Sequence, residues 1–501
     1  MPEKRQPESV AVEAPVAVEA RSGLDPWVRA DLPVPPSPRG LGWLAVVGPG
    51  VIVLGASIGS GEFLLGPAVF VRYGLSLLWV TAVAVFLQTV FNTELMRYTV
   101  ATGEPIYTGF MRTRPSSTGW GWVYATLHIL QLGWPAFAAN AAGAIFFLIT
   151  RRLAGPNDSA AVYWIGVGTF LACVAILSVG RRIEHTLEVL NWILIGCILT
   201  GFLVLALMFV RAGMWAEALA GVVGFDLPNG AFGFMPEGTN YFLLGALVAY
   251  SGAGGVSNIT LSNWARDKGY GMGTRVGYIS AAVGGERVRL AHSGFMFTPD
   301  DEGRRRWKGW WRIVRADQWG VFFVGAILGM LLPAVLYTTF LPRGTDIRGL
   351  GISASLASAI GERSGPLLAG SIAFLGAWIL FKTQLDTMEG TVRAMTDLLW
   401  TGSRRARAWR GGDVRAIYYV VLGIVAVWGV IALRLAQPIV LLQIGANIAG
   451  VIFVISSLHL LYVNTRLLPR EIRPPVWRRA MLVVMALFYG TFVALSLRSL
   501  T

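Results

Sequence analysis

Two glycine-rich stretches interrupt apolar segments that are otherwise long enough to cross a membrane as helices. Residues 56–62 (Ala-Ser-Ile-Gly-Ser-Gly-Glu) fall in the first apolar segment, and residues 251–258 (Ser-Gly-Ala-Gly-Gly-Val-Ser-Asn) fall in the sixth. Inside a bilayer every backbone N–H and C=O needs a partner, so unwound backbone is tolerated only where it lines protein or a water-filled cavity. Interruptions at matching places in two halves of a chain are typical of transporters that bind substrate near the middle of the membrane. The sequence therefore predicts broken first and sixth helices around one site.

The rest of the chain has the composition of a polytopic membrane protein. Of its 501 residues, 54% are hydrophobic and 14% are charged. The mean hydropathy is +0.58, which is too apolar for a soluble protein of several domains. Since about 20 apolar residues span a bilayer, we expect an all-α transmembrane domain over 43–498. Its eleven helices are predicted at 43–71, 75–100, 121–150, 161–180, 184–210, 240–265, 318–341, 366–399, 415–435, 438–467 and 476–498.

Basic residues are unevenly divided between the connections of these helices. Residues 267–316, after the sixth helix, and residues 404–410, after the eighth, are rich in Arg and Lys, whereas 211–239 have Arg211 as their only basic residue. Basic loops are retained on the cytoplasmic side. We therefore predict an integral multi-pass protein of the cytoplasmic membrane, with the N-terminus inside and the C-terminus outside.

The net charge of +14 is concentrated in these loops, which would lie against anionic lipid, so we expect membrane lipid and no nucleic acid as a partner. Residues 1–42 are Pro-rich and predict a disordered cytoplasmic tail. In the 267–316 loop, Tyr270, Trp307, Trp310 and Trp311 are interleaved with basic residues, which is typical of a segment in the headgroup zone; a regulatory or partner site is the alternative. No hydrolase, nucleotide-binding or zinc-enzyme motif is present, so we expect neither an enzyme nor a cofactor.

The first interruption contains the best single candidate for a ligand. A carboxylate at Glu62 is costly to bury in a membrane unless it meets a cation, a proton or a polar partner. The hydroxyls of Ser57 and Ser60 and the carbonyl of Gly59 would add hard oxygen donors, which suit Mg²⁺, Ca²⁺ or Mn²⁺ better than soft metals. Alternatively, Glu62 caps a second half-helix, where the helix dipole favours an anion.

The second interruption offers backbone carbonyls at Gly252 and Gly255 and polar side chains at Ser257, Asn258 and Thr260. These side chains either line a binding site or satisfy the free N–H groups at the start of a half-helix. The interruption contains no Met, Cys or His. A soft ligand for iron or copper is therefore missing where it would be expected.

The predicted eighth helix carries a charged stripe of Lys382, Asp386, Glu389, Arg393 and Asp397. At this spacing the five residues share one helical face and can pair along it. We expect Arg393 and Asp397, nearer the cytoplasm, to face water or the loops. Lys382 and Asp386 lie deeper and are candidates for a proton-linked switch.

Other polar residues inside the predicted helices mostly indicate interhelical hydrogen bonds. Glu94 in the second helix and His128 in the third are a candidate proton relay, because His titrates near neutral pH. Gln443 and Asn447 in the tenth helix are one turn apart, so they share a face that can project an amide oxygen into a central cavity.

Eleven helices with these two interruptions, preceded by Gly48-Pro49-Gly50, resemble the natural resistance-associated macrophage protein (Nramp) family of divalent-metal transporters. The resemblance covers nearly all of 43–498. It implies a LeuT-type fold of two inverted five-helix repeats, 43–210 and 240–467, and an extra helix at 476–498. Family members carry Asp-Pro-Gly-Asn in the first break and Met-Pro-His-Asn in the sixth helix. The matching stretches here are Gly59-Ser60-Gly61-Glu62 and Gly255-Val256-Ser257-Asn258, so the family's Asp, Met and His are replaced.

The resemblance implies secondary active transport of a divalent metal ion such as Mn²⁺ or Mg²⁺ by alternating access, with proton coupling. Two alternatives stay open. One is transport of a small organic solute such as an amino acid on the same fold, and the other is a membrane sensor that transports nothing. The predicted metal site comprises Glu62 as the charged ligand, oxygen atoms of Ser57, Gly59, Ser60, Gly252 and Gly255, the retained Asn258, and Gln443 as the match of a family glutamine.

Overall fold

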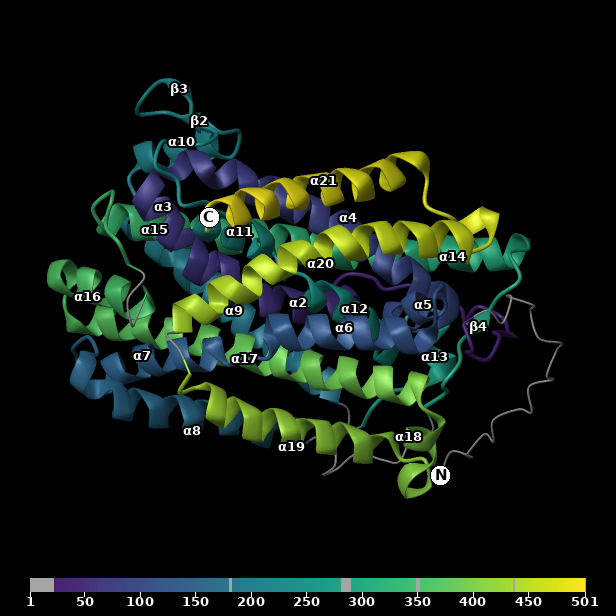
Figure 1. The fold of residues 1–501 in the computed structure, drawn as a ribbon. Helices are drawn as coiled ribbons and strands as arrows, with labels where there is room; N and C mark the ends of the chain where they lie inside the picture. The colour runs from purple at the N-terminus through teal and green to yellow at the C-terminus, as the bar shows by residue number, and fades with distance from the viewer. Residues whose placement is uncertain (1–21, 180–182, 281–289, 348–351, 436–437, 501) are drawn as a thin grey trace.

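The computed structural model describes residues 22–179, 183–280, 290–347, 352–435 and 438–500. Its helices form one bundle, in which most of the long helices run in similar directions (Figure 1). Within the described residues, ten helical segments are long and apolar enough to cross a membrane. Two shorter helices, α11 (Tyr241–Tyr250) and α12 (Val256–Asp267), together make an eleventh crossing. The chain is thus an integral multi-pass membrane protein, and the predicted all-α fold is confirmed.

We number the crossings as spans. In the first half, the first span is α2 (Pro49–Ser57), η1 (Ile58–Leu65) and α3 (Gly66–Tyr73), and the second is η2 (Leu75–Leu77) with α4 (Leu78–Thr102). The third span is α6 (Ser117–Leu132) with α7 (Ala136–Thr150), the fourth is η3 (Pro156–Asp158) with α8 (Ser159–Leu177), and the fifth is α9 (Ile183–Phe209).

In the second half, the sixth span is α11 with α12, and the seventh is α14 (Asp301–Arg315), η4 (Ala316–Phe323) and α15 (Val324–Phe340). The eighth to eleventh spans are α17 (Pro366–Gly402), α19 (Val414–Ala432), α20 (Pro438–Arg466) and α21 (Val476–Arg498).

Short elements lie at the two ends of the bundle. The basic end, at the right of Figure 1, carries α13, α14 and α18, and the opposite end carries α10 and α16. The short helices are α1 (Gly42–Val46), α5 (Ile106–Met111), α10 (Ala212–Gly221), α13 (Gly273–Val276), α16 (Ile352–Ser364), α18 (Arg404–Ala408), η5 (Trp409–Gly411) and η6 (Arg470–Ile472). Two small sheets pair β1 (Val28–Arg29) with β4 (Phe295–Met296) in parallel and β2 (Phe225–Asp226) with β3 (Ala231–Phe232) antiparallel.

Contacts between spans follow a two-fold pattern. The first span packs on the fifth and seventh, and the sixth packs on the tenth and second. The third and eighth spans, which occupy equivalent places in the two halves, pack against each other. Exchanging each of the first five spans with the span five places later maps these contacts onto one another. This is the pattern of a LeuT-type pair of inverted repeats, with α21 added against α20 and α11.

The two predicted interruptions differ in form. The sixth span is broken as predicted, because Gly252, Gly254 and Gly255 have φ values of 95°, 83° and 50°. The first span is continuous, since residues Ile58–Leu65 form a π-helix between α2 and α3, so the prediction of unwound backbone there is wrong. The Gly and Ser residues that permit unwinding also permit the wider i→i+5 turn, which keeps the backbone hydrogen-bonded inside the helix.

The third span contains an interruption that the sequence analysis did not predict. Helix α6 ends at Leu132 and α7 begins at Ala136, with Pro135 between them. Proline has no N–H and cannot continue α6. The Ala138 N–H in the first turn of α7 donates to Oε1 of Gln384 from the eighth span at 3.1 Å, which satisfies one of the N–H groups that a helix start leaves free.

Residues 22–41, here called the N-terminal strap, lie against the basic end. Trp27 is 1% exposed, and the Trp310 indole N–H donates to the Pro33 carbonyl at 2.8 Å. The prediction of a disordered tail over 1–42 is therefore wrong for this part, because Trp27 and Leu32 supply buried apolar surface. The first 21 residues lie outside the described residues.

The predicted 267–316 loop is partly helical, and its aromatic side chains face the protein. Tyr270, Trp307 and Trp310 are buried, so the prediction that they lie in the headgroup zone is wrong for these three; Trp311 is half-buried. Helix α14 turns its apolar face to the strap and the bundle and most of its basic side chains outward; Arg306 instead donates to the Leu32 carbonyl of the strap at 2.8 Å. Residues 281–289 of this segment are not among those described.

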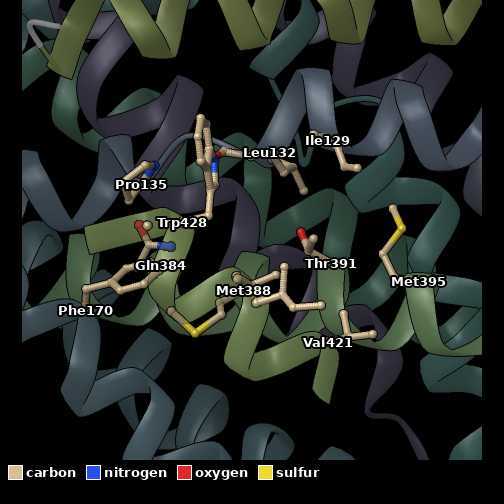
Figure 2. A pocket seen from close by; sticks show the side chains of 14 residues that line it. Ile129, Leu132, Pro135, Phe170, Gln384, Met388, Thr391, Met395, Val421 and Trp428 are labelled. Carbon is tan, nitrogen blue, oxygen red and sulfur yellow. The ribbon is translucent and has the colours of Figure 1, made fainter. Parts of the chain in front are cut away.

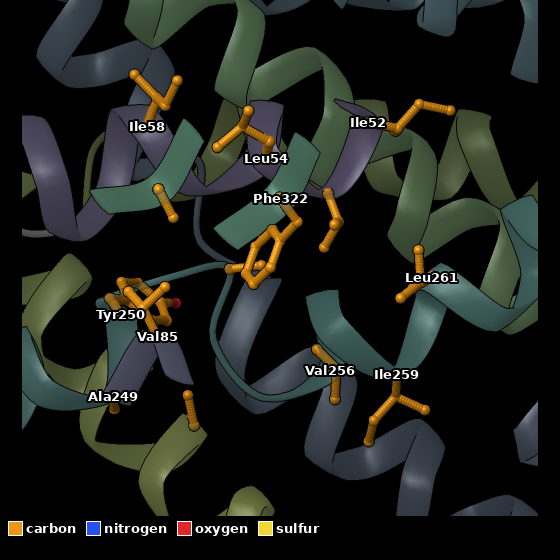
Figure 3. Packing of buried hydrophobic residues seen from close by; sticks show 14 of the residues in the cluster. Ile52, Leu54, Ile58, Val85, Ala249, Tyr250, Val256, Ile259, Leu261 and Phe322 are labelled. Carbon is orange, nitrogen blue, oxygen red and sulfur yellow. The ribbon is translucent and has the colours of Figure 1, made fainter. Parts of the chain in front are cut away.

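The first and sixth spans meet in an apolar core that also includes the seventh span (Figure 3). This packing fixes the height at which the π-helix of the first span faces the break of the sixth. The labelled members of this core are fully or almost fully buried: Ile52, Leu54, Ile58, Val85, Ala249, Tyr250, Val256, Ile259, Leu261 and Phe322.

Candidate functional site

Glu62 lies on the π-helix of the first span and points to the break of the sixth. Its side chain is fully buried. One carboxylate oxygen, Oε1, accepts hydrogen bonds from the Ser57 hydroxyl and from the Gly252 N–H at 3.1 Å. No described residue donates to the other oxygen, Oε2. Glu62 therefore holds the first span to the break and keeps one carboxylate oxygen for a further partner.

Gly252 is where the first, second and sixth spans meet. Gln88 of the second span donates from Nε2 to the Ser251 carbonyl at 2.6 Å and to the Tyr489 hydroxyl at 2.9 Å. A Cβ atom added at Gly252 would lie 2.3 Å from Gln88 Oε1, and its φ of 95° is one that residues with a side chain rarely adopt, so glycine is favoured there. Like Glu62 Oε2, Gln88 Oε1 has no hydrogen-bond partner among the described residues.

Gln131 of the third span bridges the far side of the break. Its Oε1 accepts from the Val256 N–H at 2.9 Å, and its Nε2 donates to the Gly254 carbonyl at 2.9 Å. The amide thus caps the start of α12 and also pairs a carbonyl of the unwound segment. Since unpaired backbone groups are costly inside a membrane, Gln131 stabilises this break together with Gln88 and Glu62.

Asn258, one turn into α12, meets the second span. Its Nδ2 donates to Asn92 Oδ1 at 2.9 Å, and Asn92 lies one turn after Gln88. Asn258 Oδ1 and the hydroxyl of Ser257 are buried without a hydrogen-bond partner in the described part of the chain. Buried polar groups are normally paired. Four oxygen atoms near one break that lack partners indicate a place for a ligand that accepts their lone pairs.

The predicted site residues are only partly brought together. Glu62, Ser57 and Gly252 are joined by hydrogen bonds. Ser60 donates instead to the Ser57 carbonyl at 2.8 Å, and an added Cβ at Gly59 would face Thr383 of the eighth span. Their roles, like that of Gly255 at the start of α12, stay predictions.

Gln443 lies in the tenth span, where its carbonyl accepts from Asn447 Nδ2 at 2.9 Å. In the described structure no hydrogen bond joins its side chain to Glu62. Its part in the site also stays a prediction.

Lys382 and Asp386 of the eighth span pair where the first and fifth spans cross it. Lys382 Nζ is 3.3 Å from Asp386 Oδ2 and donates to Asn191 Oδ1 of the fifth span at 2.9 Å. Asn191 Nδ2 in turn donates to Asp386 Oδ1 at 2.9 Å. All three side chains are fully buried, and an added Cβ at Gly55 would collide with them. The trio is thus sealed against the backbone of the first span.

Glu94 and His128 do not form a pair. Glu94 is held by Arg97 at 2.7 Å and by Arg478 of the eleventh span at 3.1 Å. His128 Nδ1 lies 3.1 Å from the Tyr107 hydroxyl. No hydrogen bond links them among the described residues, and their role as a proton relay stays a prediction. The two arginines neutralise the charge of Glu94. Of these two ion pairs, the sequence indicated only the one with Arg97, which lies three residues after Glu94.

Three amides that carry the site were not predicted as site residues: Gln88, Gln131 and Asn191. Each is an isolated polar residue in an apolar segment, for which an ordinary interhelical hydrogen bond is the simplest interpretation. Their only signal was position, since Gln88 and Asn92, as well as Gln131 and His128, repeat at helical spacing. The described residues contain no group of three or more His, Cys, Asp and Glu side chains that could hold a metal ion.

A separate cavity of about 420 Å³ opens on the side of the bundle between the third, fourth, eighth and ninth spans (Figure 2). Its lining is mostly apolar and includes Met388, Met395, Val421 and Trp428, with Gln384 as one of few polar groups. None of the polar groups around Glu62 lines it. This cavity faces the surroundings of the bundle and is not the candidate site.

Comparison with solved structures gives the fold. Two mutants of the manganese transporter of Eremococcus coleocola match with TM-scores of 0.61 and 0.59, at 15% and 14% identity, over 93% of this chain and 89% of that chain. The same transporter bound to an aromatic bis-isothiourea substituted compound matches with a TM-score of 0.57 at 14% identity, over 92% and 88% of the two chains. The chain has an Nramp-like fold. No protein-family model and no curated protein matches the sequence, so the likeness lies in the architecture.

Proposed function

We propose that the protein is a secondary active transporter that binds a divalent metal ion between the π-helix of the first span and the break of the sixth. The observation that carries this proposal is the buried Glu62 carboxylate with one oxygen unpartnered beside the break. Gln88, Ser257 and Asn258 add hard, uncharged oxygen atoms nearby. Such a set suits Mg²⁺ or Mn²⁺ better than a soft ion. The manganese transporters of the same fold support a metal as cargo.

Charge balance supports a coupling role for Lys382 and Asp386. A divalent ion brings two positive charges, Glu62 supplies one negative charge, and the Lys382–Asp386 pair is neutral as an ion pair. The occupied interior would keep one surplus positive charge, which is costly in a membrane. Loss of one proton from Lys382 would remove it. We therefore assign proton coupling to this pair, which touches the first span at Gly55.

The test is ion flux into proteoliposomes, with Mn²⁺, Mg²⁺ and Ca²⁺ outside and a pH-sensitive dye inside. Wild-type protein should take up one or more of these ions, and Glu62→Gln should abolish the uptake. The matched control is Glu471→Gln, which changes an exposed glutamate outside the spans and should leave uptake intact. Uptake by Glu62→Gln at wild-type affinity would overturn the proposal.

A small organic cation or amino acid is the second candidate, and one observation favours it. Among the described residues, Glu62 is the one carboxylate that reaches the break. The other polar groups there are amides and hydroxyls, such as Gln88, Asn92, Asn258 and Ser257. Such groups also recognise the amine and carboxylate of a solute. Saturable binding of an amino acid, unchanged by any of the three metal ions, would favour this candidate over the metal.

A further inference from the structure

The charged stripe of the eighth span is buried along its whole length. Asp386, Glu389 and Arg393 are fully buried and Asp397 is 3% exposed, although Arg393 and Asp397 were expected to face water or the loops. These positions descend α17 from the Lys382 pair toward the basic end. The half of this span nearer the basic end therefore carries a continuous row of buried charges.

The row is closed on one side by the sixth span. Arg393 pairs with Glu389 on its own helix at 2.5 Å and with Asp267 at the end of α12. The Trp264 indole N–H of α12 donates to Glu389 Oε2 at 2.7 Å. One turn further on, Arg266 pairs with Asp397 at 2.6 Å. Arg393 thus connects the eighth span to α12, the half of the sixth span nearer the basic end.

The fifth span closes another side of the row. Glu188 of α9 pairs with Lys268, the residue after α12, at 2.5 Å. Glu184, one turn before Glu188, interacts electrostatically with Lys268 and Arg393 and is 3% exposed. Its Oε1 has no hydrogen-bond partner among the described residues. This buried carboxylate oxygen therefore has no described donor that a cation would have to displace.

The network holds more acid than base, and such a network is a poor way to stabilise a fold. Buried ion pairs are commonly no better than well-packed apolar residues, and ionisable residues inside a membrane usually belong to a pathway. Six carboxyl groups meet four basic groups among the described residues of this network, which leaves more carboxyl groups than bases to meet a cation. The acids are Glu184, Glu188, Asp267, Asp386, Glu389 and Asp397, and the bases are Arg266, Lys268, Lys382 and Arg393.

We propose that this buried stripe is the closed exit path of the transported cation toward the basic end, and that Arg393 is the latch that keeps it shut. When α12 of the sixth span moves away from the eighth span, the ion pair between Arg393 and Asp267 breaks. The carboxylates of the fifth and eighth spans then line a hydrated passage below Glu62. This inference rests on the proposed function for the identity of the cargo, but the latch itself is tested without transport.

The test uses the access of a thiol reagent to the seam between the sixth and eighth spans. Both native cysteines, Cys173 and Cys197, are first replaced by alanine. Gly390→Cys then places a thiol in the seam, because a Cβ there lies 3.4 Å from Thr260 and Trp264, an ordinary contact. The control is Ala373→Cys, at a fully buried position of α17 nearer the other end. A membrane-impermeant cationic methanethiosulfonate is applied to the purified protein in liposomes that expose the basic end.

Arg393→Gln should raise the labelling rate of the Gly390→Cys thiol by about tenfold or more, since removing one partner of a buried pair costs the closed state several kcal/mol. Labelling of the Ala373→Cys thiol should stay unchanged, and Arg393→Lys should restore protection at Gly390→Cys. Asp267→Asn removes the same pair from the other side and should act like Arg393→Gln, which guards against one variant that fails to fold.

Equal labelling of the Gly390→Cys thiol with and without Arg393 and Asp267 would overturn the latch. Because labelling requires no cargo, faster labelling in a protein without metal flux would sustain the latch and reject the proposed cargo. Metal flux combined with unchanged labelling would reject the latch and leave the proposed function standing.

Discussion

Gly61→Ala should weaken substrate binding, because the added methyl group would push the first span away from the sixth. Gly61 lies on the π-helix next to Glu62, and a Cβ there would lie 2.0 Å from the carbonyl oxygen of Tyr250, the last residue of α11. An ordinary contact needs at least 3.4 Å, so the first and sixth spans must separate by 3.4 minus 2.0, or 1.4 Å. The obstacle is backbone and cannot rotate away. Overpacking of this kind costs about 1–3 kcal/mol.

The assay compares thermal stability and metal binding of purified Gly61→Ala and Gly168→Ala. Gly168 lies in the middle of α8, where an added Cβ meets nothing within 4 Å, and Ala is favoured over Gly in a helix by about 1 kcal/mol. We expect the control to be as stable as wild type or slightly more so. Gly61→Ala should melt earlier and bind Mn²⁺ or Mg²⁺ about tenfold more weakly, because about 1.4 kcal/mol corresponds to tenfold in affinity. If both variants behave alike, the close approach of the first and sixth spans at Gly61 does not define the site.

Three further changes test other parts of the structure. Trp27→Ala removes a fully buried side chain at a cost of about 3–5 kcal/mol, so it should free the N-terminal strap, and hydrogen exchange over 22–41 should rise while the spans stay protected. Burial opposes ionisation of Glu104, but its ion pair with Arg112 outweighs this and lowers the pKa of that carboxyl. The stabilisation by this pair is fully present above the ordinary glutamate pKa of about 4.3. It is lost as the pH falls through the lower pKa that Glu104 has in the folded protein. The melting temperature of Glu104→Gln should therefore lie below that of wild type at pH 7, and the gap should narrow below about pH 4; a constant gap would contradict this. Gln131→Ala leaves the Val256 N–H and the Gly254 carbonyl unpaired, at a cost of about 1–3 kcal/mol each. Metal binding should therefore be lost at temperatures where the protein is still folded. Unaltered metal binding would mean that water replaces the amide.

The sequence allowed the fold to be predicted because the constraints of a bilayer are local. Apolar length indicated the spans, and the glycine runs indicated where the backbone departs from α-helix. Glycine and serine at 57–61 do not distinguish an unwound segment from a π-helix, because both conformations need small residues and the choice depends on packing against Tyr250 and Thr383. Pro135 was a visible breaker, yet its consequence depends on Gln384, about 250 residues away.

The site was predictable only where a charge stood in an apolar segment. Glu62, Lys382 and Asp386 were recognised for that reason, and the structure buries all three. The partners of these charged residues were not predictable, because they lie far apart in the chain. Glu94 pairs with Arg478 and not with His128, and Arg393 pairs with Asp267 and does not face water. A charged residue near a helix end is usually solvated, and only the arrangement of neighbouring spans shows that this one is enclosed.

The difference between the two interruptions bears on how the site opens. The first span keeps its helical hydrogen bonds through the π-helix, so it can tilt as one rod from Gly48, whose N–H, like that of Gly50, donates to Asp317 of the seventh span at 2.8 Å. The sixth span has a hinge at 251–255, where unwound backbone can absorb a change in φ and ψ. Movement of α12 about this hinge would break the Arg393 latch while Gln131, fixed on the third span, still caps its start. Of the two glycine-containing interruptions, the one in the sixth span can bend without loss of helical hydrogen bonds, whereas the π-helix of the first cannot, and the proposed latch therefore places its movement in the sixth span.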